Sequence, residues 1–578
     1  MRSQVPAPTA PDPASADSAP NAEGRASRTE PLCILGACAA AVLALFPVVR
    51  MVGIVLDGSA LQHNDYWLML PRFTGVSGTL DVGGLFEFQN QPVVVAQLLY
   101  WLNLKLFAGS NIALGLVVVL LVLGQLTVVA LLLRHSRPGA VGAIATFVVA
   151  SALLFNLTGT WNFAKSMSGA AWLSANLLAL VAIYLRSRDR RWSAFAIAVL
   201  AALAYSTGLA AWIGVIATGV VRRPLREAWR EWPFVVGFAA TVLWYRANGG
   251  GVSSGWPNPV DVVRQAAVLL GFILGLDGVL GEVVGSIALI AVPVLAVLLA
   301  STSRVAGWVG VAVFGLVATL EVSFGRGDFM EELGVQDRYS SLPALTWLGL
   351  VALVIIAIRR FDDRGGTTAA IGRSAGRWKP LLPLAVTAPV LLGALTAGGE
   401  HAEVMRNLTD DQELREVALR LGVTDGTSYL VGLGIPSTVS DVMRANDHHP
   451  FVDGWDLDCG LLDTELELEA EAPVTRGEGA LTSGRALFVL PDAVELSGHL
   501  STGSDVRCVV IANQDGVVVG AATIGPDAGG HAVPASTTRF KALARRGADT
   551  YRAFVVVDGT AEPLPLDGEL TAQQVDAA

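Results

Sequence analysis

The sequence predicts an α-helical polytopic membrane protein with about eleven transmembrane helices, followed by a C-terminal extracytoplasmic domain that joins a helix to a β-sandwich. Three observations predict this fold class. Of the 578 residues, 53% are hydrophobic and only 16% are charged. Several uncharged stretches approach the ~20 residues that a helix needs to cross ~30 Å of hydrocarbon. After residue 398, a charged stretch with helical periodicity is followed by short β-rich runs.

The N-terminal segment is rich in Pro, Ala, Ser and Asp and shows no apolar periodicity. Such a segment buries too little apolar surface to order itself, so we expect residues 1–30 to be a disordered cytoplasmic tail. The apolar run 32–56 follows Arg25 and Arg28, as the core of a signal peptide would. It is too long for such a core and lacks a convincing cleavage site, which favours a retained first span.

The short loops predict the orientation of the chain in the plasma membrane. "RHSRPG", "RSRDRR" and "RRPLREAWR" alternate with loops that are poor in Lys and Arg. Because cytoplasmic loops carry the excess of basic residues, the N-terminus is expected inside and the C-terminus outside. Segment 260–276 is expected to lie on the outer face or re-enter from it, since a crossing there would put the basic stretch 359–379 outside. The expected spans are 32–56, 111–133, 141–157, 169–185, 193–205, 209–221, 233–245, 283–300, 305–320, 342–358 and 381–397.

This topology divides the chain into the tail, a membrane domain at 31–398 and an extracytoplasmic domain at 399–578. The first outer loop is long and covers 57–110. In the extracytoplasmic domain, a charged helix at 400–421 precedes β-rich runs such as "VRCVVIAN" and "YRAFVVVDG". Turn sequences such as "NQDG" suit hairpins between these runs. The pattern predicts a small β-sandwich.

The four cysteines divide between the two domains. Cys33 and Cys38 lie in the first span, where a free thiol behaves as a small apolar group. Cys459 and Cys508 lie in the extracytoplasmic domain, where a disulfide can form and persist. Their positions in sequence fix neither geometry nor redox state, so the pairing stays open at this point.

Polar chemistry is expected outside the membrane, because the expected spans contain almost no ionisable residues. A coupled transporter usually places carboxylates or His near the bilayer midplane, so this class is disfavoured. No basic stripe indicates a nucleic-acid partner. The functional residue types gather in outer segments such as "LQHNDYWLMLPRF", "TGTWNFAKS" and "QDRYSSLP". The run "VVVAQLLYWLNLKLF" predicts an interfacial helix with Gln97, Asn103 and Lys105 facing water.

An acid soon after the first span, an interfacial helix in the first outer loop and a late Arg-Tyr pair resemble the GT-C glycosyltransferases. "FEFQNQPVVVAQLLYWLNLKLFAGSN", "NFAKSMSGAAW", "AYSTGLAAW" and "QDRYSSLP" are also similar to blocks of a bacterial membrane-protein family. That family commonly has Glu-His-Arg where this chain has Gln89, Asn90 and Gln91, so no role is carried over from the triplet. The resemblance covers about residues 60–350.

The resemblance implies transfer of a sugar from a polyprenyl-phosphate donor to an envelope glycan or glycolipid acceptor on the outer face of the membrane. Such chemistry needs a carboxylate that deprotonates the acceptor hydroxyl, and cations or a divalent metal that hold the leaving phosphate. The resemblance makes Asp65 the expected base, with Asp81 and Glu87 as the alternative carboxylates. The expected substrate-binding residues are His63, Asn64, Lys165, Arg338, Tyr339 and Arg50.

Simpler interpretations compete with each of these roles. Asp65 would then be a solvated loop residue, Arg50 a side chain that reaches the interface from within the span, and Arg338 an interfacial anchor. His448 and His449 are interpreted as a surface turn, because their spacing matches no known metal site. The alternative function is a non-enzymatic membrane scaffold or passive permease whose outer β-sandwich is a binding domain.

Overall fold

The structure is a computed structural model. It describes residues 23–63, 65–75, 78–87, 91–248, 258–300, 303–333, 337–364, 382–423, 437–453, 455–466, 479–483, 492–501, 506–525, 537–557 and 563–576. Residues 1–22 of the expected tail lie outside this part of the chain. The first helix, α1 (Glu23–Leu56), begins before the expected end of the tail at residue 30.

Seven helical stretches of the described part are long and apolar enough to cross a membrane. Five of them are Cys38–Leu56 in α1, Asn111–Ser136 (α4), Ser166–Ser187 (α7), Gly278–Leu298 (α12) and Ser303–Gly325 in α13 (Ser303–Leu333). The stretch Ala140–Ala164 combines α5 (Ala140–Leu154), η2 (Leu157–Gly159) and α6 (Thr160–Ala164). The stretch Asp337–Arg360 combines η5 (Asp337–Tyr339) with most of α14 (Ser341–Arg364). This finding supports a polytopic membrane protein.

The expected number of about eleven spans is too high by this criterion. Four expected spans fall in helices of only 14 to 16 residues. At 1.5 Å per residue these helices are ~21–24 Å long, shorter than ~30 Å of hydrocarbon. They are α8 (Arg191–Ala204), α9 (Leu209–Arg222), α10 (Trp232–Ala247) and α16 (Leu382–Thr396). Between α8 and η3 (Ser206–Gly208), Tyr205 is extended at φ −165°, which agrees with the separation of the expected spans 193–205 and 209–221.

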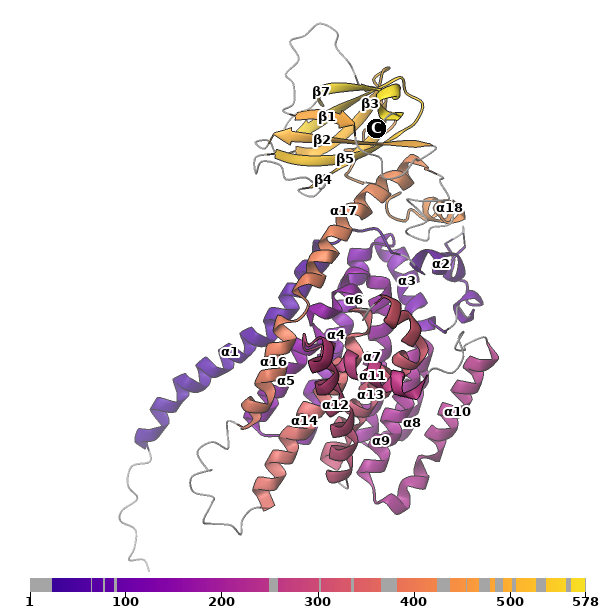
Figure 1. Ribbon diagram of the computed structural model, residues 1–578. Helices are drawn as coiled ribbons and strands as arrows, with labels where there is room; N and C mark the ends of the chain where they lie inside the picture. The colour runs from indigo at the N-terminus through magenta and orange to yellow at the C-terminus, as the bar shows by residue number, and fades with distance from the viewer. Residues whose placement is uncertain are drawn as a thin grey trace, which may run out of the picture.

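The helices pack side by side in one bundle (Figure 1). α13 lies against α9 and α14, while α7 lies against α4 and α8. Small residues permit close approach, as at Gly349, where a Cβ would meet the backbone nitrogen of Ala312 on α13 at 2.6 Å. The bundle core includes the fully buried Trp212, Trp308 and Phe314.

A helical hairpin of α11 (Pro259–Phe272) and α12 packs on the bundle. The side chain of Asn258 accepts a hydrogen bond from the Val260 backbone nitrogen and caps α11. The Trp347 indole donates to the Leu270 carbonyl at 2.8 Å, which attaches the second half of α11 to α14. The expectation that this segment does not cross the membrane stays a prediction.

The bundle end opposite the C-terminal domain contains a buried charge network. Arg186, at the end of α7, is fully buried and binds Glu231 at the end of η4 (Leu225–Glu231) through two hydrogen bonds. Arg186 also bonds Asp189 at 3.1 Å, and Arg222 lies 2.6 Å from the same carboxylate. Although Asp189 is partly desolvated, Arg222, Arg186 and Arg223 hold its pKa below the ordinary value.

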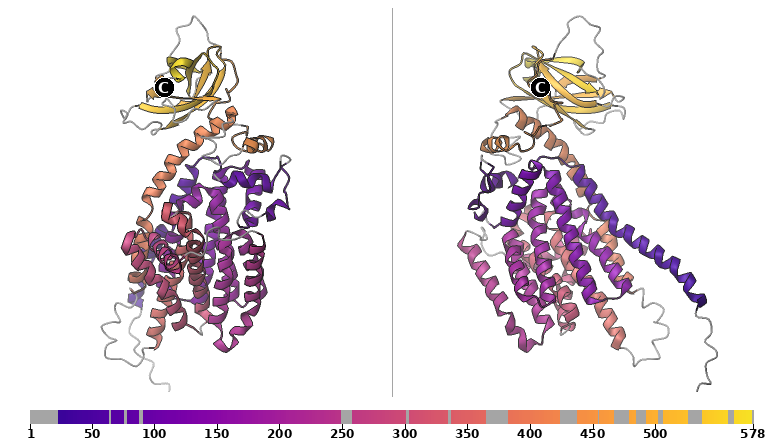
Figure 2. Two further views of the ribbon diagram at one scale, coloured as in Figure 1. Left: turned by 45° about the vertical axis from the view of Figure 1, so that its right-hand side comes forward. Right: turned by 180° about the vertical axis from the view of Figure 1, so that it is seen from behind.

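The segment expected to form the first outer loop folds at the other end of the bundle, the end near the C-terminal domain (Figure 2). It contains α2 (Asp65–Phe73), η1 (Gly84–Phe86) and α3 (Val94–Phe107). The orientation expected for α3 is wrong in part. Gln97 and Asn103 are buried, because Gln97 bonds Met69 and Asn103 bonds the Ser110 carbonyl. Lys105 is exposed, as expected.

The helix α17 (Gly399–Leu421) leads from the bundle to the C-terminal domain (Figure 1). Its bounds agree closely with those of the helix expected at 400–421. The short helix α18 (Ser437–Ala445) follows and packs on α2. The strands are β1 (Gly479–Ser483), β2 (Ala493–Ser501), β3 (Val506–Asn513), β4 (Val518–Gly525), β5 (Thr537–Arg545), β6 (Thr550–Val557) and β7 (Leu564–Thr571), followed by α19 (Ala572–Asp576).

These strands form a closed barrel in the order β1-β2-β5-β4-β3-β6-β7, so the expected β-sandwich is wrong. β1 pairs in parallel with β7 at Ala480 and Asp567, and this contact closes the sheet. Closure pairs the edges that a sandwich would leave open. Inside, the Phe540 ring lies where a Cβ at Gly498 would be, only 2.2 Å from a ring carbon, so glycine makes room for the ring.

A disulfide joins Cys459, in the segment before the barrel, to Cys508 on β3. Their Cα atoms are 6.1 Å apart, within the range that a disulfide requires. The pairing that the sequence left open is therefore present in the structure. It attaches residues 455–466 to the barrel wall.

Candidate functional site

Charged side chains from four distant parts of the sequence act on one another at the barrel-side end of the bundle. α6 packs against both α17 and η5, and α2 packs on α3. We call the set His63, Asp65, Lys165, Arg338 and Arg415 the barrel-side cluster. Lys165 interacts electrostatically with Arg415, Arg338 and Asp65, and His63 interacts with Lys165 and Arg415. Three cations and one carboxylate therefore share this site.

Asp65 is the first residue of α2 and its side chain is exposed. An acidic residue in the first helical turn interacts favourably with the helix dipole. The next two residues, Tyr66 and Trp67, are fully buried, and the Tyr66 ring lies 5.5 Å from the ring of Tyr100 on α3. The charge of Asp65 also acts on Tyr100. A buried aromatic anchor thus fixes the start of α2 and leaves the carboxylate accessible.

Lys165 occupies the junction between α6 and α7, where the backbone leaves the helical conformation at φ −98° and ψ 72°. The side chain is only 8% exposed, and its ammonium lies 3.4 Å from the centroid of the Trp161 ring. Burial, together with the charges of Arg415 and Arg338, lowers the pKa of Lys165 to about 8, and the charge of Asp65 opposes them. A desolvated cation beside two arginines is a favourable place for an anion.

Arg338 and Tyr339 lie in η5, and Asn162 of α6 donates to the Arg338 carbonyl at 3.0 Å. The Arg338 guanidinium lies 5.1 Å from the centroid of the Tyr339 ring. Tyr339 contacts Trp172 at 5.4 Å between centroids, and Trp172 contacts Tyr205 at 4.3 Å. These rings form an aromatic cluster that continues from Arg338. Tyr339 is 1% exposed and Trp172 5%, so the cluster belongs to the bundle core and holds η5 against α7.

His63 is neutral and acts as a link between the first outer loop and α17. Burial, with help from Lys165 and Arg415, lowers the pKa of His63 to about 3. Its Nδ1 lies 3.0 Å from Nε2 of Gln412 on α17. His63 therefore positions α17 against the loop and carries no charge of its own at neutral pH.

A buried carboxylate on the same helix adds a second link. Glu416 accepts hydrogen bonds from the Ser59 hydroxyl at 3.0 Å and from the Trp455 indole at 3.1 Å. His449 Nε2 lies 3.0 Å from its Oε1. Glu416 follows Arg415 directly, so these contacts set the rotation of α17. They thereby place Arg415 near Lys165.

His448 and His449 have different partners, which argues against a shared metal. His448 Nδ1 donates to the His449 carbonyl at 2.7 Å, so its Nε2 accepts from the Tyr66 hydroxyl at 3.2 Å. Burial lowers the pKa of His448 to about 4 and keeps the ring neutral. Within the described part of the chain, no group of three or more His, Cys, Asp and Glu side chains is placed to hold a metal ion.

Some expected site residues lie apart from the cluster. Arg50 is exposed on α1. Asp81 is exposed and stabilises its own turn, because its carboxylate accepts from the Gly84 nitrogen at 3.0 Å. Glu87 is exposed at the end of η1. Asn64 lies outside the described residues, as do Gln89 and Asn90 of the replaced triplet.

Sequence reasoning missed Arg415, Tyr100 and Tyr205. The three residues Gln412, Arg415 and Glu416 follow the i, i+3, i+4 spacing that places side chains on one helix face. That spacing was available as a signal, but α17 has charges all around it, so the spacing alone does not select this face. Comparison of the chain with known protein families, with curated proteins and with solved structures finds no match. Fold and site therefore rest on the geometry alone.

Proposed function

We propose that the protein is a GT-C-like glycosyltransferase, which moves a sugar from a polyprenyl-phosphate donor to an envelope glycan or glycolipid acceptor. The observation that carries the proposal is the electrostatic interaction of Asp65 with Lys165, which also interacts electrostatically with Arg338 and Arg415. An exposed carboxylate beside three cations, at one end of a membrane bundle, supplies a base and an anion site together.

In the proposed reaction, Asp65 accepts the proton of the acceptor hydroxyl. The hydroxyl oxygen then forms a bond to the anomeric carbon of the sugar. The bond from that carbon to the phosphate oxygen breaks, and the oxygen keeps the electron pair as polyprenyl phosphate leaves. Lys165 and Arg338 stabilise the negative charge on the departing phosphate.

The proposal includes an orientation in the plasma membrane. The bundle end opposite the barrel carries the basic loops with Arg134, Arg186, Arg222 and Arg359, which favours the cytoplasmic side. The barrel, α17 and the barrel-side cluster are then extracytoplasmic, together with the disulfide.

Transfer of label tests this function. Membranes that contain the full-length protein receive polyprenyl-phosphate sugars labelled in the sugar, and label is followed into glycan and glycolipid fractions. Asp65→Asn keeps size and polarity but removes proton acceptance, so transfer should fall ~10²-fold or more. Asp81→Asn and Glu87→Gln are matched controls on the same loop, and both should retain transfer.

Two outcomes would redirect the proposal. Loss of transfer in Asp81→Asn or Glu87→Gln, with full transfer in Asp65→Asn, would assign the base to another carboxylate. Retained transfer in all three variants would remove the catalytic role of this loop. The protein would then be better described as a membrane scaffold that presents the barrel.

A further inference from the structure

A cleft of about 750 Å³ opens between α1, α4, α5 and α14 at the bundle end opposite the barrel. It exists because α1 diverges from the other helices (Figure 1) and leaves side chains such as Val42 and Phe46 exposed. Its volume lies in the range of ~300–1,000 Å³ that small-ligand sites span. The cleft is separate from the barrel-side cluster, so nothing said of it depends on the proposed function.

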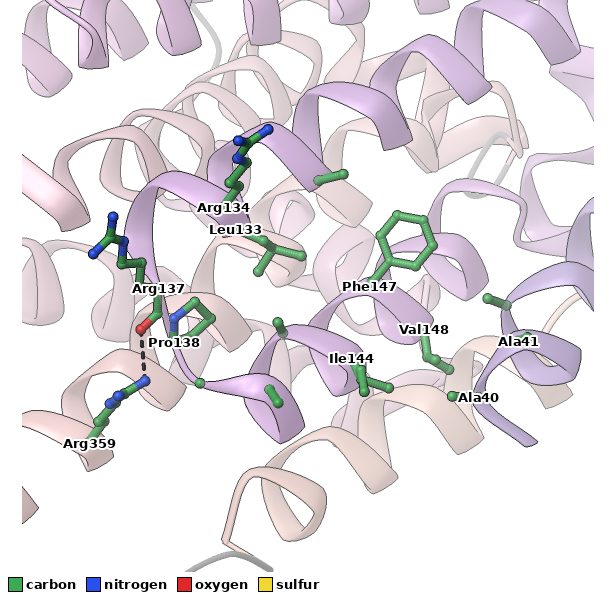
Figure 3. A pocket seen from close by; sticks show the side chains of 15 residues that line it. Ala40, Ala41, Leu133, Arg134, Arg137, Pro138, Ile144, Phe147, Val148 and Arg359 are labelled. Carbon is green, nitrogen blue, oxygen red and sulfur yellow. Dashed lines mark hydrogen bonds between the residues drawn. The ribbon is translucent and has the colours of Figure 1, made fainter. Parts of the chain in front are cut away.

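The lining of this cleft is polarised. Of the 15 lining residues, three are arginines and the other twelve are uncharged, so none is acidic. The arginines Arg134, Arg137 and Arg359 lie at one end, and the alanines of α1, such as Ala40 and Ala41, lie at the other (Figure 3). A surface with cations at one end and apolar side chains along the rest matches a molecule with an anionic head and a hydrocarbon chain.

The backbone holds the three arginines together. α4 ends at Ser136 and is capped by Arg137, which adopts the left-handed conformation at φ 52°. Pro138 and Gly139 then turn the chain directly into α5. Arg359 of α14 donates from Nη1 to the Arg137 carbonyl at 2.8 Å. A guanidinium has five N–H donors, so this one bond leaves Arg359 able to bind a phosphate as well. All three side chains are exposed at the rim of the cleft.

We propose that the cleft binds one anionic glycerophospholipid from the surrounding leaflet. Its phosphate lies between Arg134, Arg137 and Arg359, and an acyl chain packs along Ile144 and Phe147. The volume suits an acyl chain but is too small for a polyprenyl chain, which is several times longer. A lipid in this position fills the gap between α1 and the bundle.

Native mass spectrometry of the delipidated full-length protein tests this site by titration with phosphatidylglycerol, phosphatidylcholine and a polyprenyl monophosphate. The wild type should bind phosphatidylglycerol in preference to phosphatidylcholine. Replacing all three cleft arginines with glutamine should weaken phosphatidylglycerol binding ~10-fold or more. The matched control replaces Arg190, Arg226 and Arg304, which are exposed, are not among the cleft-lining residues and change the net charge equally.

A second variant keeps the charges and fills the cleft. Ala143→Trp places a large ring among the lining residues, so it should also reduce phosphatidylglycerol binding while all three arginines remain. Equal loss in the control triple variant would overturn the site, as would unchanged binding in both cleft variants. Equal binding of phosphatidylcholine would remove the role of the arginines, and tighter binding of the polyprenyl monophosphate would refute the choice of a glycerophospholipid.

Discussion

The pKa of Lys165 should move in opposite directions when two of its neighbours are neutralised. It lies near 8, against an ordinary value of 10.5, because of burial and the charges of Arg415 and Arg338. Arg415→Gln removes the stronger of the two charges that lower the pKa of Lys165, so this pKa should rise. Asp65→Asn removes the charge that opposes them and should lower it further. Two variants with opposite signs distinguish local charge effects from general unfolding.

The structure also sets the magnitude of this effect. The difference from 10.5 means that the fold disfavours the protonated ammonium by ~3 kcal/mol. Below pH 8 both folded and unfolded chains are protonated, and this cost is present in full. Between pH 8 and 10.5 the folded chain has lost the proton that the unfolded chain keeps, so the free energy of unfolding rises with pH. A bound phosphate should raise the pKa of Lys165, because it favours the cation.

Competitive labelling of amines measures this pKa directly. The chain has four lysines, Lys105, Lys165, Lys379 and Lys541, so peptide mass spectrometry separates them cleanly. The exposed Lys105 reports the reactivity of the reagent at each pH. In the wild type, labelling of Lys165 should have its midpoint near pH 8. A midpoint above pH 10, or shifts of the same sign in Arg415→Gln and Asp65→Asn, would refute the reasoning.

Three further variants test the contacts that hold the site and the fold. Glu416→Ala removes a buried acceptor shared by the Ser59 hydroxyl and the Trp455 indole, so the free energy of unfolding should fall by ~2–3 kcal/mol. Hydrogen exchange at 437–453 should also be faster, and unchanged exchange would contradict the link. Glu231→Gln leaves Arg186 buried without its counter-charge, so the free energy of unfolding in a denaturant titration should fall by ~3–5 kcal/mol. A fall of less than ~1 kcal/mol would mean that water reaches Arg186. Replacing Cys459 and Cys508 with serine should lower the stability of the barrel by ~2–4 kcal/mol, seen as earlier thermal unfolding, and no change would show that strand pairing alone suffices.

Part of the site was predictable because the topology of a membrane protein places alternate loops at the same end of its helix bundle. Asp65, Lys165 and Arg338 belong to segments that all leave the bundle at the same end, where Asp65 and Arg338 both interact electrostatically with Lys165. Arg415 was not predictable, because its place depends on how α17 is rotated. That rotation is set by Glu416, whose partners lie hundreds of residues earlier or tens of residues later in the chain.

The fold, too, was predictable only in part. Apolar runs predict membrane helices because burial in lipid needs length and hydropathy, which are local properties. The expected spans 193–205 and 209–221 already separate at Tyr205, where the structure breaks the helix. Apolar runs do not report whether helices as short as α8 cross the membrane, so the expected count of about eleven spans was too high. The β-rich runs predict strands, but the order of strands depends on contacts such as Ala480 with Asp567, which local turn sequences do not encode. The sequence pattern of strands and turns is therefore the same for a closed barrel and for a sandwich.

The most direct test of the account is a cryomicroscopy structure of the full-length protein with a bound polyprenyl monophosphate. The account predicts phosphate density within ~3 Å of both the Lys165 ammonium and the Arg338 guanidinium, with the carboxylate of Asp65 on the same side. Phosphate density at Arg50, or in the cleft beside Arg134, with the barrel-side cluster empty, would contradict the account.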